Sequence, residues 1–422
     1  MPQHLQCRIC ETSLPEPFLD FGHVPLANSF LASPAEFASE ATYPLAVTGC
    51  PTCGLVQLNH VVPAEQLYRD YIYVSSTSDG VRAHAEYLAR TLIAQYAWTP
   101  SDAIVEVASN DGTVLQAFQR RGLRVLGVEP ARNIAAIANA AGIPTIVEFF
   151  NTESAHTVLR AHGRASAILG RHVFAHVDDV HEFFEAVKEC LADNGVFLVE
   201  VPYLGDFLAK LEFDTIYHEH LSYVSLGAME HLCRQHDMAL TDVEPIALHG
   251  GSVVIHMRRN AMGAAPSARL TQMMQRERES GVTDPRRLAK FAVDVKAWKA
   301  RFEALIDRLR KEGAVLVGYG AAAKANTLMC YCPAAAKSMS YILDRSTHKQ
   351  GRYTPGTHLR VEPVDRWMNA PHPTHMVLLA WNFKDEIIAQ MRPFSDRGGR
   401  FVVPIPEPHV IQSQYREASA RP

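Results

Sequence analysis

Two Cys-x-x-Cys pairs near the start of the chain constrain its fold more than any other feature. The pairs are Cys7/Cys10 and Cys50/Cys53. Each pair places two thiolates on one tight turn, and two such turns can close a tetrahedral site around one ion. Gly54 follows the second pair, at a position that commonly needs a positive φ. Four sulfur ligands leave no open coordination position, so the pattern predicts a structural zinc ion. Redox-active pairs are the alternative.

Composition limits the remaining possibilities. A chain of 422 residues predicts two to four domains. The balance of 41 Lys+Arg against 45 Asp+Glu lacks the basic excess of nucleic-acid binders. No apolar run approaches the ~20 residues that span a bilayer, and the first residues do not resemble a secretory signal. We therefore expect a cytoplasmic protein without a nucleic-acid or membrane partner. The other cysteines are expected to be buried thiols: Cys190, Cys233, Cys330 and Cys332.

Beyond the cysteine segment, strand-length apolar runs alternate with helical stretches. Expected strands are 103–108, 124–129, 145–148, 167–170 and 195–201, and expected helices include 86–98, 113–121, 133–141 and 180–192. After a boundary near 245–262 and a long helix over 285–312, strands are expected again at 314–320, 340–344 and 375–381. This alternation predicts α/β domains built on parallel sheets. The expected modules are residues 1–75, 76–245 and 246–422.

The first α/β unit has a candidate cofactor site where its first strand ends. The strand carries Glu106 and runs into a turn, after which a helix begins; the turn residues are Ser109, Asn110, Asp111 and Gly112. The second strand ends at Glu129-Pro130, where a carboxylate can accept ribose hydroxyls. This arrangement serves NAD and S-adenosylmethionine (SAM) alike. The lack of GxGxxG and the presence of Asp111 favour SAM, and an α/β domain without nucleotide is the alternative.

Polar residues also follow the fourth and fifth strands of this unit. The fourth strand leads to His172 and His176, and Asp178 and Asp179 are expected to cap the next helix. The segment 212–225 contains Tyr217, His218, Glu219, His220 and Tyr223. Either histidine could act as a base, with the glutamate orienting it and a tyrosine stabilising an oxyanion. A metal site or a structural polar cluster are the alternatives. Upstream tyrosines, including Tyr71, suit the lining of a pocket.

The second α/β unit offers groups for an anionic ligand. A strand, a glycine turn and a helix start over residues 317–327 present Lys324 and Asn326. The loop 344–357 holds His348, Lys349, Arg352 and Tyr353, which suits a phosphorylated ligand. A solvated basic loop is the alternative. Two nucleotide-like sites in one chain suggest group transfer onto a nucleotide-bearing substrate.

The chain resembles the SAM-dependent sugar C-methyltransferases of deoxysugar biosynthesis over nearly its whole length. The resemblance rests on the cysteine pattern with LANSF (26–30) and on the following motifs: SNDGT (109–113), GVEP (127–130), VFAHVDD (173–179), EVPYL (200–204), EFDTIYHEHLSY (212–223), GYGAAAKANT (318–327) and DRSTHKQGRYTPGTH (344–358). The family implies an α/β protein with an N-terminal zinc module that holds its ion by four cysteines. A SAM-binding class I methyltransferase domain and a C-terminal Rossmann-like domain follow.

The resemblance also implies a reaction and roles for the residues. The substrate would be a nucleotide-linked 4-keto-6-deoxysugar, methylated at C3 through an enolate. His220 would be the base, Tyr217 and Glu219 would contact the enolate, and His176 and Tyr71 would hold the hexose. Further implied substrate contacts are Tyr203, His218 and Tyr223; implied SAM contacts are Glu106, the turn residues, Glu129, Pro130 and His172. A monomer or weak homo-oligomer is expected.

The chain departs from the family pattern at three positions. Ala108 and Ala325 stand where Gly is usual, and His172 stands where Asn is expected. None of these changes removes a proposed catalytic group. Three other functions compete with the resemblance: an NAD-dependent sugar-nucleotide epimerase or dehydrogenase, a nucleic-acid methyltransferase, and a non-catalytic scaffold.

Overall fold

The computed structural model describes residues 5–69, 71, 73–246 and 250–411, and its contacts divide the chain into two compact units. The first unit comprises Met1–Pro17, Val47–Asp206 and Glu219–Arg287, and the second comprises Phe18–Ala46, Phe207–His218 and Leu288–Pro422. The chain therefore passes between the units several times. The expected division into three modules stays a prediction.

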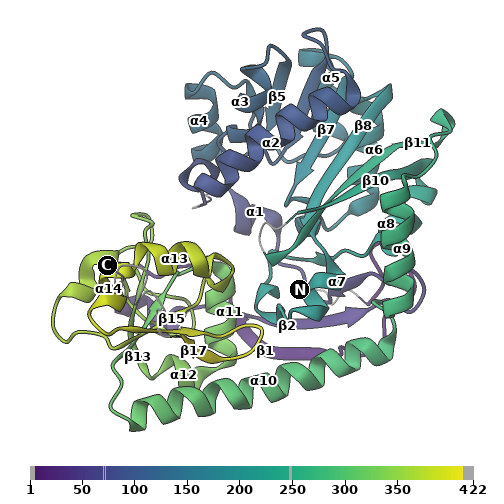
Figure 1. Cartoon of the computed structure of the whole chain (residues 1–422). Helices are drawn as coiled ribbons and strands as arrows, with labels where there is room; N and C mark the ends of the chain where they lie inside the picture. The colour runs from purple at the N-terminus through teal and green to yellow at the C-terminus, as the bar shows by residue number, and fades with distance from the viewer. Residues whose placement is uncertain (1–4, 70, 72, 247–249, 412–422) are drawn as a thin grey trace, which may run out of the picture. The chain divides into compact units, whose positions relative to one another are not determined.

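A seven-stranded sheet forms the centre of the first unit, in the order β10-β11-β8-β7-β4-β5-β6 (Figure 1). Its five parallel strands are β4 (Ala103–Val107), β5 (Arg124–Val128), β6 (Thr145–Ile146), β7 (Ala165–Arg171) and β8 (Leu191–Pro202). The strand order reverses between β4 and β7. In open α/β sheets, ligands bind outside the carboxyl ends of the strands at such a point.

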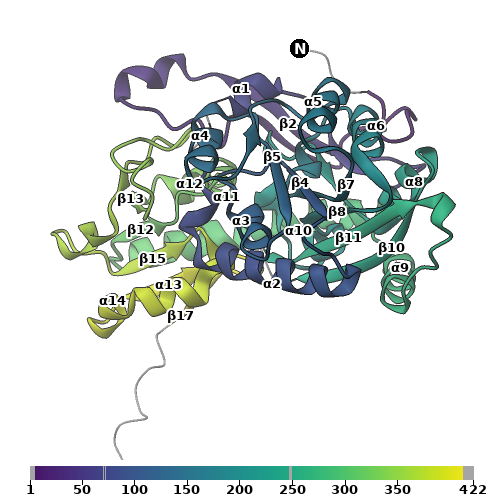
Figure 2. The ribbon, with the colours of Figure 1, turned by 90° about the horizontal axis from the view of Figure 1, so that it is seen from above.

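Helices cover both faces of this sheet (Figure 2). One face packs on α2 (Asp79–Tyr96) and α3 (Thr113–Gln119), and the other on α5 (Thr152–His162) and α6 (Val180–Cys190). Neighbouring residues of β4 point to opposite faces of the sheet. Ile104 belongs to the core formed with α2 and α3, and Val105 belongs to the core formed with α5 and α6. Further helices of this unit are α1 (Ala64–Tyr68), α4 (Arg132–Ala140), α8 (Leu226–Gln235) and α9 (Ala268–Ser280), and α7 (Leu204–Ala209) begins in it.

The expected α/β character is confirmed, and the expected strands and helices are present with shifted ends. The helix expected at 86–98 begins at Asp79, because the side chain of Ser78 caps it by accepting from Val81 N at 3.3 Å. Asp179 caps α6 as expected, accepting from the backbone N–H groups of His181 and Glu182. The N-cap of α6 is Asp179 rather than Asp178, and Asp178 Oδ1 accepts from Arg8 Nε at 3.0 Å.

Two antiparallel strands extend the sheet where the sequence suggested a boundary. They are β10 (Met238–Ile246) and β11 (Ser252–Arg259), which pair with each other, and β11 also pairs with β8. A division after residue 245 thus falls near the end of β10, between two paired strands of one sheet.

The cysteine segment contributes short strands to the first unit. Residues 47–49 of β2 (Thr42–Gly49) pair with β3 (Val56–Leu58), and β3 pairs with β9 (Ser222–Tyr223). The pairing of β3 with β9 brings the cysteine segment against the chain that follows His220. Among the described residues, no helix has the length and apolar character needed to cross a membrane.

The second unit is built on a six-stranded sheet in the order β14-β13-β12-β15-β16-β17. Its parallel strands are β12 (Leu316–Tyr319), β13 (Met339–Leu343), β14 (Val361–Glu362), β15 (His375–Leu378) and β16 (Arg400–Val403), and β17 (His409–Ile411) is antiparallel. Its helices are α10 (Pro285–Lys311), which begins in the first unit, α11 (Ala323–Tyr331), α12 (Pro333–Ala336), α13 (Lys384–Gln390) and α14 (Arg392–Asp396), and β1 (Leu19–Pro25) also belongs to it.

Candidate functional site

The turn after β4 is tied to the tip of β5 by one carboxylate. Glu129 Oε2 accepts from Asn110 N and Glu129 Oε1 accepts from Ala131 N, each at 2.8 Å. Burial raises the pKa of this carboxyl, which these two bonds oppose. Each oxygen keeps a further lone pair, so Glu129 can still accept a hydroxyl. Pro130 lies beside it, partly exposed.

The same turn also binds the segment before α2. Asn110 Oδ1 accepts from Ser75 N at 2.9 Å, and Asp111 Oδ2 accepts from Ser76 N at 3.0 Å. Asp111 Oδ1 accepts from the hydroxyl of Thr113 at 2.6 Å, at the start of α3. Asp111 therefore orders the turn in addition to any contact with a cofactor. The left-handed φ values of Ala108, Asn110 and Gly112 make this turn tight.

Two buried polar atoms at the end of β4 lack a hydrogen-bond partner within the described part of the chain. They are Glu106 Oε2 and Ser109 Oγ. Burial raises the pKa of Glu106 to about 8, although Arg171 opposes the shift. Unsatisfied buried polar atoms are rare in native proteins and indicate a missing partner. A hydroxyl and a carboxyl at a topological switch point fit the amino group and ribose of SAM.

A glycine in β5 makes room for this turn. A Cβ on Gly127 would stand 2.4 Å from Ser109 Oγ and 2.9 Å from Thr145 Oγ1. Only a residue without a side chain allows the turn to approach β5 so closely.

A buried carboxylate on β8 organises the neighbouring strand end. Glu200 accepts from Arg171 Nε at 3.1 Å and Nη2 at 3.0 Å, from His172 Nε2 at 2.9 Å and from His84 Nε2 at 2.7 Å. Burial opposes ionisation, but the charge of Arg171 and the bonds from His172 and His84 hold the pKa of Glu200 well below its usual range. The motif EVPYL supported the resemblance, but no role was predicted for its Glu200. No local sequence pattern indicated His84 on α2.

Several of the expected catalytic residues gather in the first unit. The hydroxyl of Tyr71 donates to Glu219 Oε2 at 3.1 Å, and Tyr68 lies 2.8 Å from His176 Nδ1 and 3.2 Å from Glu219 O. The rings of His176 and His220 meet edge to face, with centroids 5.0 Å apart. Burial and the nearby charge of His172 lower the pKa of His176 to about 3. The upstream tyrosines were expected to line a pocket, and one of them, Tyr68, contacts both His176 and Glu219 in this cluster.

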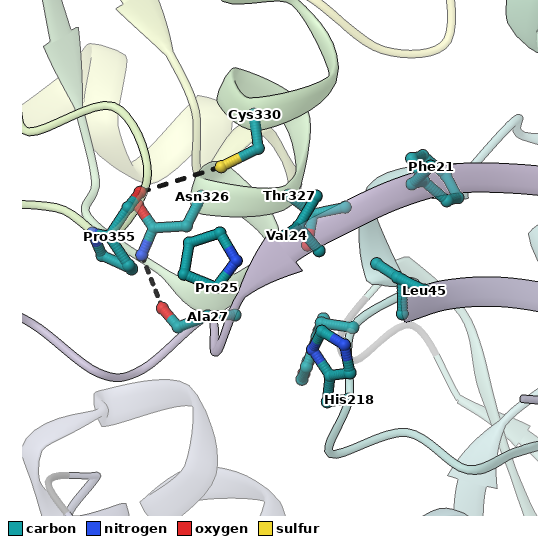
Figure 3. A pocket seen from close by; sticks show the side chains of 11 residues that line it. Phe21, Val24, Pro25, Ala27, Leu45, His218, Asn326, Thr327, Cys330 and Pro355 are labelled. Carbon is teal, nitrogen blue, oxygen red and sulfur yellow. Dashed lines mark hydrogen bonds between the residues drawn. The ribbon is translucent and has the colours of Figure 1, made fainter. Parts of the chain in front are cut away.

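The other two residues of the same motif belong to the second unit. His218 is buried, and its Nε2 lies 3.2 Å from Pro44 O. Tyr217 and His218 line a small pocket of about 10 Å³ in this unit, in which Figure 3 shows His218. Asn326 shares this lining, and its Nδ2 donates to Ala27 O at 2.6 Å. The division between the units therefore falls inside the YHEH motif, between His218 and Glu219.

The structure gives Tyr203 and Tyr223 partners within the fold. The hydroxyl of Tyr203 donates to Glu277 Oε2 at 2.9 Å, and the same buried glutamate accepts from two backbone N–H groups at the start of α8. Tyr223 is buried on β9 and pairs with Val56.

The expected phosphate-binding residues differ in exposure within the second unit. His348 and Arg352 are exposed, and Tyr353 is half-buried. Lys349 Nζ donates to Ala321 O at 2.8 Å. Lys324 Nζ is buried 4.5 Å from the ring centroid of Trp381, with no hydrogen-bond partner in the described residues. Burial lowers the pKa of Lys324, and the charge of Asp214 opposes this.

The four expected metal ligands lie together, with all Sγ atoms within 4.8 Å of one another. The Sγ atoms of Cys7 and Cys53 are 3.4 Å apart, as are those of Cys10 and Cys50. Zinc with Zn–S bonds of about 2.3 Å separates its ligands by about 3.8 Å, so four thiolates at these positions fit a zinc ion. Gly54 has the expected positive φ of 77°.

Comparisons with known proteins cover most of the chain. Family models match a zinc binding domain over residues 7–68, a methyltransferase domain over 81–243 and a C-methyltransferase C-terminal domain over 247–406. The chain is 35% identical over 410 residues to the C-methyltransferase NovU of Streptomyces niveus, covering 97% of each.

Two solved structures each resemble less than half of the chain. The PH0226 protein of Pyrococcus horikoshii is 13% identical with a TM-score of 0.35, covering 44% of this chain and 94% of its own. The CcbJ methyltransferase of Streptomyces caelestis is also 13% identical with a TM-score of 0.35, covering 45% of this chain and 96% of its own.

Proposed function

The chain belongs to the SAM-dependent C-methyltransferases, and from this premise we propose that it methylates C3 of a nucleotide-linked 4-keto-6-deoxysugar. Membership in this family decides against the NAD-dependent and non-catalytic alternatives. The observation that carries the proposal is the cluster of His220, His176, Glu219 and two tyrosines in the first unit. We also propose that the protein is cytoplasmic and that it is a monomer or a weak homo-oligomer.

Methylation at carbon needs a base, because the acceptor carbon must first lose a proton. The C4 ketone acidifies the proton at C3, and the electron pair of the broken C–H bond moves into an enolate. His220 takes this proton. His176 is a poor base at neutral pH because its pKa is about 3. The choice of His220 over His218 rests on the resemblance to the sugar C-methyltransferases.

The residues around His220 position the sugar and the developing charge. Glu219 and Tyr71 are hydrogen-bonded to each other, so their side chains are held in place before substrate binds. His176 stays neutral and is fixed by Tyr68, which suits it to hydrogen-bonding a sugar hydroxyl. Tyr217 would contact the enolate oxygen, where a phenol can stabilise negative charge. After transfer, His220 returns its proton to solvent.

SAM, when bound, supplies the electrophilic methyl group that the enolate carbon attacks. Glu106, Ser109 and Glu129 would hold its amino group and ribose, and Asn110, Asp111 and Gly112 shape the turn beneath it. Pro130 borders this position. His172 would border the methyl donor, and its hydrogen bond to Glu200 would hold its ring in place there.

The nucleotide of the sugar would be bound by the second unit. Lys324, Lys349 and Arg352 offer positive charge for a diphosphate, and His348 and Tyr353 offer rings beside it. Asn326, His218, Tyr203 and Tyr223 complete the proposed substrate contacts. The three modules expected from the sequence would then divide zinc binding, methyl donation and nucleotide binding among them.

A mass spectrum tests the reaction. Incubation with SAM and a panel of nucleotide-linked 4-keto-6-deoxyhexoses should add one methylene to a member of the panel and form an equal amount of S-adenosylhomocysteine. Methylation at oxygen or at another carbon, located by NMR of the product, would contradict the proposal.

A further inference from the structure

Arg8 lies between the two cysteines of the first pair, and its side chain is fully buried. Its Nε donates to Asp178 Oδ1 at 3.0 Å, and its Nη1 donates to Leu58 O at 2.8 Å and approaches Leu221 O at 3.5 Å. Its backbone N–H donates to Gln57 Oε1 at 2.9 Å. One guanidinium thus contacts three segments that are far apart in the sequence.

Two of these segments carry the proposed catalytic histidines. Asp178 stands two residues after His176, and Leu221 directly follows His220. The two segments are also joined to each other, because Leu221 N donates to Ala175 O at 2.7 Å. Leu221 O accepts from Leu58 N at 2.9 Å, which places it next to the carbonyl that Arg8 also contacts.

We propose that Arg8 is a positioning residue, which sets the His176 and His220 segments against each other from the cysteine cluster. The catalytic meaning of this role rests on the proposed function, whereas the ordering of the two segments does not. The zinc module would then act on the reaction through Arg8, besides stabilising its own fold.

The geometry explains why arginine suits this position. Donation from Nε in one direction and from Nη1 in another requires the fixed planar fork of a guanidinium. A lysine has one terminal nitrogen and cannot keep the same bonds in the same directions. The buried positive charge needs its acidic partner, so the bond to Asp178 holds the His176 segment in one position.

The test compares Arg8→Gln and Arg8→Lys with the surface control Arg234→Gln. Arg234 is exposed and pairs with Glu230 on α8, so its loss should change nothing measured here. For Arg8→Gln we expect one zinc per chain, SAM affinity within about twofold of wild type and faster amide exchange over 172–178 and 219–224. The kcat should fall between about tenfold and hundredfold, as misplaced catalytic groups do. Arg8→Lys should recover part of the loss.

A second variant keeps the test decisive if Arg8→Gln loses zinc. Asp178→Asn leaves the cysteine pairs untouched and should still speed amide exchange in both segments. Unchanged exchange and kcat in a zinc-loaded Arg8→Gln would overturn the proposal, as would loss of zinc combined with unchanged exchange in Asp178→Asn. If no sugar is methylated by wild type, the exchange experiment still decides the role of Arg8.

Discussion

At the scale of single residues, the fold strongly alters the protonation of Glu106. Burial raises its pKa to about 8, so the carboxyl is mostly protonated at pH 7. A cationic cofactor beside it favours the ionised form. Binding of SAM should therefore release up to one proton at pH 7, and the affinity should rise with pH until it levels off near pH 8.

Calorimetry in two buffers of different ionisation enthalpy measures this proton release. Glu106→Gln should abolish the release while the turn stays folded. Proton uptake by the wild type, or no exchange of protons at all, would show that Glu106 does not face the positive charge of SAM.

The tyrosine that holds Glu219 gives a second prediction at this scale. Tyr71→Phe removes the hydroxyl that donates to Glu219 Oε2 at 3.1 Å. We expect kcat to fall between about tenfold and a hundredfold, because a charge-assisted hydrogen bond contributes roughly 1.5–3 kcal/mol. SAM affinity should not change. Tyr87→Phe, which removes a bond to Glu244 on the surface, is the matched control, and an equal loss in both variants would speak against a catalytic contact of Tyr71.

At the scale of elements, the contact between β5 and the turn after β4 leaves no room for a side chain on Gly127. Gly127→Ala would drive a Cβ to within 2.4 Å of Ser109 Oγ. Overpacking of this kind costs about 1–3 kcal/mol, which corresponds to a drop of several degrees in the thermal midpoint. SAM affinity should fall as well, because the turn must move.

Gly80→Ala is the matched control for this substitution. Gly80 lies in α2, and a Cβ there would meet its nearest neighbour, Ser78 Oγ, at 3.7 Å. Alanine should leave stability equal or slightly higher, since glycine is the poorer helix former. Equal thermal midpoints and SAM affinities for the two variants would show that the turn tolerates a side chain at Gly127.

Elements with strong local patterns could be predicted from the sequence. β4, β5, β7 and residues 195–201 of β8 are mostly apolar and buried, and their residues alone indicate strands. β10 could not be recognised in the same way, because it mixes Thr, Asp, Glu and Pro245 and depends on its pairing with β11. Its place in the sheet is set by tertiary contacts that no local window contains.

At the scale of the whole molecule, the long-range contacts of the site could not be predicted. His84 meets Glu200 across 116 residues, and Arg8 meets Asp178 across 170. Motifs predicted which residues carry the chemistry, such as those of the turn after β4 and of the YHEH segment. They could not show which buried groups hold those residues in place, because His84 and Arg8 belong to no sequence pattern that indicates their distant partners.

Removal of zinc should affect both the stability and the activity of the whole chain. A chelator that takes the ion should lower the thermal midpoint and abolish methyl transfer, because a structural zinc site contributes directly to folding. Metal analysis before treatment should give one zinc per chain, and Cys50→Ser should lower that content. Full activity in protein stripped of metal would contradict a structural role of the ion.

The central claim is that His220 removes the proton from C3. The most direct measurement is deuterium incorporation at C3 of the accepted 4-keto sugar in heavy water, with S-adenosylhomocysteine in place of SAM. We predict that the wild-type protein exchanges the C3 proton for deuterium. His220→Ala should bind S-adenosylhomocysteine normally but exchange the C3 proton at least about a hundredfold more slowly, as expected for loss of a general base. Exchange by His220→Ala at the wild-type rate would contradict the account.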